Sequence, residues 1–237
     1  QLSYHDVVFN NLGATLIFDQ QDVQIKSLKA QVFDGQLSAN GEYSLHDNAL
    51  RADANFTDVQ VQNLLAQLKA NPLISGQMNL HVDMLSQGKN ERELLDNLQA
   101  TLEAQLADGA FQGVSIEELV SDPLMYYAQD PMGNNALSVD YTKQTRFNTF
   151  ALQAKIADQE VALQGLDIQG DMGSLALGKE PAYYNWQRNE MFVPAQLEIN
   201  APVSVQQSGI LIQVKNVSLP IYITGPRENL RIHLNKQ

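Results

Sequence analysis

The chain has 237 residues, no cysteine and a formal net charge of −12 at pH 7. This length is enough for an ordinary hydrophobic core, and the lack of cysteine excludes disulfides and thiolate chemistry. The acidic balance argues against nucleic acid or an anionic membrane surface as a partner.

No apolar run is long enough for a transmembrane helix or a signal peptide. Because the chain begins with Gln1 rather than methionine, we expect it to be part of a longer protein.

Residues 1–61 are predicted to form a meander of antiparallel strands, because turn-forming residues recur about one strand apart, at 11–13, 19–22, 34–35 and 46–48. Between Ile25 and Leu28 the apolar alternation slips by one residue, which predicts a bulge. The next segment, Val61 to Leu68, has the apolar spacing of a short helix, and Pro72 prevents its continuation.

A strand–helix–strand unit is predicted over residues 74–120. Residues 74–84 alternate between apolar and polar, which is typical of a strand with one dry face. Asn90 with Glu93 predicts the start of a short helix, and a returning strand around 102–106 is expected to stop at Asp108-Gly109. Ser115 with Glu118 then resembles a second capping box.

Beyond this unit we expect a short helix at 122–127, a loop over 129–144 and further strands from 145 to the end. The chain is therefore treated as a single domain with four parts. These are a strand meander with a short helix (1–73), a strand–helix–strand core (74–120), a helix and loop (121–144), and C-terminal strands (145–237).

Several of these segments together resemble the AsmA family of envelope proteins. The most specific part is Asp108-Gly109-Ala110-Phe111-Gln112-Gly113-Val114-Ser115-Ile116, which follows Gly76 and Gly88 at the expected places. The leucine-bearing segment 61–68 and the terminal run 219–226, with its proline and glycine, also match the family pattern. Residues 171–172 depart from it, since two residues stand between glycines where one is expected.

The predicted fold class is mainly β with a few short α-helices (α+β). The expected architecture is a curved, largely antiparallel multi-stranded sheet, with an open groove as one form it can take. About three short helices cannot cover a sheet this wide, so a second sheet, another domain or a ligand must cover part of its apolar face. AsmA proteins resemble curved β structures whose apolar face is thought to hold lipid acyl chains. On that interpretation the groove candidates are Met78, Leu80, Val82, Met84, Leu102 and Leu106. Ordinary core packing of the same residues is the alternative.

An aromatic-rich segment around residues 178–194 is the least expected feature. It is interpreted as a loop that plugs an open sheet end or contacts a ligand or partner, through Tyr183, Tyr184, Trp186 and Phe192.

No catalytic, metal or cofactor motif is present. The four histidines are not paired at metal-ligand spacing, His81 is expected to be solvated, and Gly113-Val114-Ser115-Ile116 lacks the last glycine of a nucleophile elbow. We therefore predict no enzyme activity and no cofactor.

The resemblance implies a periplasmic domain, tethered to the inner membrane of a Gram-negative cell by an N-terminal anchor outside this segment. The function it implies is non-enzymatic: outer-membrane biogenesis through binding or transfer of phospholipid or another envelope lipid, with envelope proteins as further partners. Two alternatives stay open, an interaction scaffold for outer-membrane protein assembly and a hydrolase of an envelope lipid or glycan.

Overall fold

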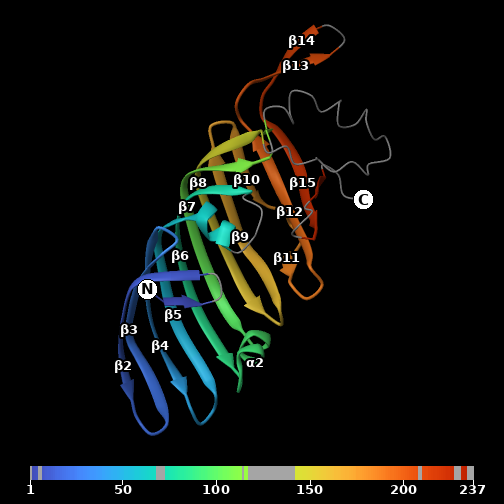
Figure 1. Cartoon of the computed structure of the whole chain (residues 1–237). Helices are drawn as coiled ribbons and strands as arrows, with labels where there is room; N and C mark the ends of the chain where they lie inside the picture. The colour runs from blue at the N-terminus through green and yellow to red at the C-terminus, as the bar shows by residue number, and fades with distance from the viewer. Residues whose placement is uncertain are drawn as a thin grey trace.

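A computed structural model describes residues 2–4, 7–67, 73–113, 115–116, 142–207, 210–226 and 231–233. Within these residues the chain forms a 14-stranded antiparallel sheet, a separate two-stranded sheet and two short helices (Figure 1). The predicted mainly β class and the largely antiparallel arrangement are therefore confirmed.

Neighbouring strands of the large sheet follow the chain order from β1 to β10, and the sheet continues through β12, β15 and β16. The first half comprises β1 (Leu2–Tyr4), β2 (Val7–Phe18), β3 (Asp22–Val32), β4 (Gly35–Ser44), β5 (Ala49–Gln60), β6 (Ile74–Gln87) and β7 (Gln99–Gln112). The second half comprises β8 (Gln144–Ala157), β9 (Glu160–Gly170), β10 (Gly173–Leu177), β11 (Ala182–Asn185), β12 (Glu190–Ile199), β15 (Val217–Gly225) and β16 (Arg231–His233). The pair β13 (Val203–Gln207) and β14 (Ile210–Val214) stands off one end (Figure 1).

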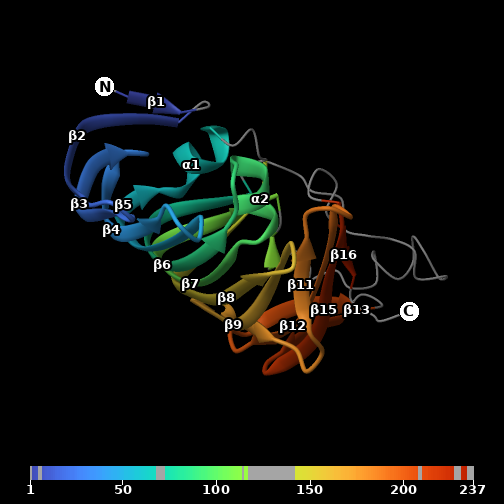
Figure 2. The same cartoon turned by 90° about the horizontal axis from the view of Figure 1, so that it is seen from below.

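Two short helices, α1 (Val61–Gln67) and α2 (Glu91–Asp96), connect β5 to β6 and β6 to β7. Figure 2 shows the sheet bending around both of them, so they lie on its concave side. The Asn90 side chain accepts a hydrogen bond from the Glu93 backbone N–H at 3.0 Å, which confirms the predicted cap of α2.

The main core lies between α1 and the part of the sheet near the start of β6. Val59, Met78, Leu106 and Phe147 are buried there, and Leu64 and Leu65 of α1 are among the residues packed against them. Three phenylalanine rings meet beside them, with ring centroids 5.1 Å apart for Phe111–Phe147 and 5.8 Å for Phe147–Phe150. A second cluster holds Leu197, Ile199 and Ile221 on β12 and β15.

Two of the predicted turns are wrong. At both positions the strand continues and contains a bulge. The β2 strand passes residues 11–13 with Asn11 at φ 49° and a register shift against β3. Likewise β7 continues past Asp108 (φ 50°) to Gln112, with a register shift opposite Ser75 and Gln77. A residue in the left-handed region serves a bulge as well as a turn, so Asn, Asp and Gly could not distinguish the two in sequence.

The other local predictions that fall on described residues agree with the structure. The register between β3 and β4 shifts between Ile25 and Leu28, as predicted. Residues 33–34 and 45–48 form turns, and the strand predicted over 74–84 lies within β6. The helix predicted at 122–127 and Glu118 of the second capping box lie outside the described residues. So does the loop predicted over 129–144, except for its last three positions.

Candidate functional site

Cross-strand pairing builds one continuous apolar face on the sheet. Residues that pair across antiparallel strands share a face, so each register row extends from strand to strand. One such row comprises Leu37, Phe56, Leu80, Ala104, Leu152 and Leu166. The next comprises Ala39, Ala54, Val82, Leu102, Ala154 and Leu163.

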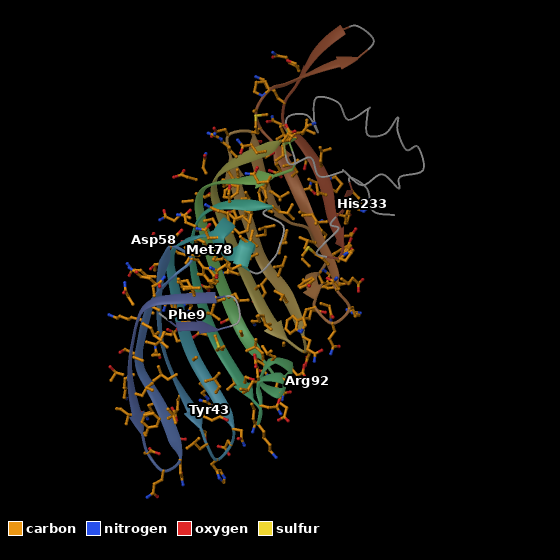
Figure 3. The ribbon with its side chains drawn as sticks, in the orientation of Figure 1. Phe9, Tyr43, Asp58, Met78, Arg92 and His233 are labelled. Carbon is orange, nitrogen blue, oxygen red and sulfur yellow. The ribbon has the colours of Figure 1, made fainter. Side chains whose placement is uncertain are left out.

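The two helices cover only the two ends of β6 on this face. Met78 lies near the start of β6 (Figure 3), and Leu64 and Leu65 of α1 pack against the core that holds it. At the other end, the buried Ser86 hydroxyl donates to the Leu94 carbonyl of α2. Between these ends Val82 is buried, whereas Leu80, which packs against the α1 core, and Met84 are only partly buried. The apolar face is therefore the concave one, and its middle is not covered by either helix.

The six groove candidates lie together on this face but differ in burial. Met78, Val82 and Leu106 are 8%, 7% and 5% exposed. The remaining three, Leu80, Met84 and Leu102, are half-buried. Across β6 and β7, Met78 pairs with Leu106 and Val82 pairs with Leu102. Met78 and Leu106 belong to the core next to α1, and the half-buried Leu80 packs against it.

A hollow of about 1010 Å³ crosses β3 to β8. Its lining includes the apolar-face row Ile25, Gly41, Ala52, Met84, Ala100 and Ile156. It also includes the two mostly polar rows on either side. One is Gln24, Glu42, Arg51, Leu85, Gln99 and Ala157, and the other is Lys26, Asn40, Asp53, Asp83, Thr101 and Lys155.

The neighbouring rows of the apolar face, with Leu50, Val82 and Leu102, do not line this hollow. Because side chains alternate between faces, a hollow bounded by two polar rows lies on the polar face, above the backbone of the middle row. We call it the polar trough. It is not the apolar groove expected from the sequence.

The aromatic segment is a hairpin in the sheet rather than a loop. Tyr183 and Tyr184 lie in β11, which pairs with both β9 and β12, and Phe192 lies in β12 opposite Tyr183. Trp186 starts the turn, where its backbone N–H donates to the Gln159 backbone carbonyl at 3.3 Å. The predicted loop is thus corrected to a hairpin, because aromatic residues favour strands, while the predicted plug or contact role stays a prediction.

The aromatic side chains separate into two faces. Rings of Tyr183, Phe192 and Tyr222 form a row across β11, β12 and β15, with centroids 6.1 and 6.2 Å apart. Tyr184 points to the opposite face from Tyr183 because the two are neighbours in one strand. Burial raises the pKa of Tyr183 above its usual value, and the nearby Glu190 carboxylate adds to the shift.

Charged groups on the polar face are brought together in ways that the sequence did not indicate. Asp53, His81 and Asp83 converge there from β5 and β6, although Asp53 is far from the other two in sequence. At the turn between β2 and β3, backbone N–H groups of Gln21 and Asp22 lower the pKa of Asp19. The interaction at Asp19 fixes this turn.

The fold places this chain in a class of protein: those built on an extended antiparallel sheet with one apolar concave face and one polar face. A family model narrows this class, because the AsmA family model matches residues 1–165, more than two thirds of the chain. The chain belongs to the AsmA family, an envelope protein family. Comparisons with curated proteins and with solved structures found no match. In the described part of the chain, neither helix has the length and apolar character to cross a membrane.

Proposed function

We propose that this chain binds phospholipid or another envelope lipid by laying acyl chains on its apolar face, and that it acts without catalysis in outer-membrane biogenesis. The observation that carries this proposal is the continuous apolar face between α1 and α2, whose middle residues Leu80, Met84 and Leu102 are only partly buried. Membership of an envelope family supports the same class of function.

The dimensions of the face suit an acyl chain. Leu80 to Met84 spans five residues of strand, roughly 17 Å at about 3.4 Å per residue. One acyl chain fills about half of the roughly 30 Å hydrocarbon core of a bilayer, so it matches this length. Burial contributes about 0.8 kcal/mol per methylene, and a dozen methylenes buried on one side only would contribute on the order of 5 kcal/mol.

The proposal includes a periplasmic location with a tether to the inner membrane, as the family resemblance implies. Hydrolysis of an envelope lipid or glycan is not part of it. Apolar contact needs neither a nucleophile nor a perturbed carboxylate, and the charged residues that line the trough lie on the opposite face of β3 to β8.

Native mass spectrometry of protein purified from the periplasm without detergent, followed by lipid extraction, tests the proposal. We expect a bound phospholipid that is lost in Leu80→Asp and Leu102→Asp and retained in Gln105→Asp, a matched change at an exposed position of β7. Circular dichroism controls for folding. Lipid that is equally bound by all three folded variants would refute the assignment to this face.

A second candidate function, an interaction scaffold, is favoured by the β2 strand. Its twelve residues carry no charge, and β1 pairs only with Val7–Phe9 among the described residues. Leu16 and Phe18 are 44% and 69% exposed. Edge strands usually carry charges or proline that prevent pairing with other chains, so this strand is suited to accept another envelope protein. Leu16→Lys would then abolish pull-down of that protein while lipid stays bound.

A further inference from the structure

Three side chains with metal-ligating atoms converge on the polar face of the sheet. Asp83 pairs with Asp53 across β6 and β5, and His81 lies two residues before Asp83 on the same face. One donor atom from each of the three residues lies within 4.8 Å of the other two. The group is independent of the apolar face and of the proposed lipid function.

Asn55 orients two of the three ligands. Its Nδ2 donates to Asp53 Oδ1 at 3.2 Å, which leaves its Oδ1 as the acceptor facing His81 Nδ1 at 2.9 Å. The Nδ1 atom of His81 therefore carries the hydrogen, and Nε2 is the atom available for coordination. A histidine ligand whose other ring nitrogen donates to a carbonyl is the common outer-shell arrangement of metal sites.

The other ring nitrogen of His81, Nε2, faces two carboxylates. His81 Nε2 lies 3.2 Å from Asp83 Oδ2 and 3.5 Å from Asp53 Oδ2. Two anionic oxygens aimed at one imidazole nitrogen need a positive charge between them, which either a proton on Nε2 or a bound metal cation supplies. Zinc bonds of about 2.0–2.2 Å in tetrahedral geometry separate neighbouring ligand atoms by roughly 3.3 Å, close to both measured distances.

We propose that Asp53, His81 and Asp83 bind one divalent transition-metal ion of the Zn²⁺ class. One imidazole and two carboxylates are a ligand set that suits Zn²⁺, and solvent completes the coordination because the side chains are 32%, 37% and 62% exposed in that order. The ion would join β5 to β6 beside the polar trough, which Asp53 and Asp83 also line.

Isothermal titration calorimetry of ZnCl₂ into the untagged, EDTA-treated and dialysed chain tests the site. We expect one saturable ion per chain, at least tenfold weaker in His81→Gln and in Asp83→Asn. Asn55→Ala should weaken it about 10- to 100-fold, as loss of an outer-shell partner does. The matched control is His46→Gln, because His46 lies 3.9 Å from a single carboxylate, that of Asp47.

A second readout needs no variant. In ¹⁵N spectra of the wild-type imidazoles, added Zn²⁺ should shift His81 Nε2 and leave its Nδ1 protonated. Absence of saturable binding, binding unchanged in His81→Gln, or loss of binding in His46→Gln would each overturn the proposal.

Discussion

Gly109 is predicted to be intolerant of any side chain, although its place in an Asp-Gly pair suggests an ordinary turn glycine. It lies inside β7, where a Cβ atom would overlap the ring of Phe147 and the backbone carbonyl of Ser75. Phe147 is 2% exposed and held between Phe111 and Phe150, so its ring cannot move aside. The Gly109→Ala change therefore overpacks the core.

The expected loss of unfolding free energy follows from these contacts. Overpacking a well-filled core costs about 1–3 kcal/mol, and the carbonyl overlap places Gly109→Ala near the upper end. Phe147→Ala alone should cost about 3–5 kcal/mol through the lost ring. In the double variant the ring overlap is absent, so the combined cost should be at least about 1 kcal/mol below the sum of the two single costs.

Urea unfolding followed by circular dichroism measures these free energies. Gly165→Ala in β9 is the matched control, because its nearest neighbour would be the Gln153 side-chain oxygen at 3.4 Å, an ordinary contact. It should change stability by less than about 1 kcal/mol. Strict additivity of Gly109→Ala and Phe147→Ala would refute the steric argument, as would a harmless Gly109→Ala.

Three further predictions concern the helix cap, the apolar face and the hairpin. Asn90→Ala should cost about 1 kcal/mol and speed hydrogen exchange in α2, whereas an unchanged exchange rate would show that the cap is dispensable. Met78→Ala should cost about 2–5 kcal/mol in urea unfolding and Met84→Ala clearly less, because Met78 is buried and Met84 is only half-buried; equal costs would contradict this burial difference. Burial, and then the Glu190 carboxylate, raises the pKa of Tyr183 above 10.0. The neutral phenol therefore stabilises the fold at pH values below 10, and this stabilisation is lost as the pH rises through the raised pKa. Glu190→Gln should lower that pKa in a spectrophotometric titration, and no change would exclude the carboxylate as a cause.

Local elements were predictable where one strong signal governs them. The helix over 61–67 follows from its leucine spacing, and the cap of α2 follows from Asn90 and Glu93. The bulge between Ile25 and Leu28 was visible as a slip in alternation. Each of these depends on residues within one or two turns of the chain, so no long-range information was needed.

Features that depend on register between strands were not predictable. Gly109 lies in a strand opposite Phe147 and in close approach to Gly76, and both contacts come from pairing with distant strands. His81 was expected to be merely solvated, since nothing in the sequence shows that Asp53 pairs opposite Asp83. The split of Tyr183 and Tyr184 between two faces likewise required the hairpin that pairs β11 with β12.

Site-specific photocrosslinking in living cells tests the central claim most directly, using neighbouring residues that face opposite sides of the sheet. A photoreactive amino acid placed at Leu102 or Leu80 lies on the apolar face, and one at Thr101 or Asn79 lies on the polar face. We predict lipid adducts at Leu102 and Leu80 and none at Thr101 and Asn79. Equal labelling on both faces, or labelling confined to the polar face, would contradict lipid binding on the apolar face.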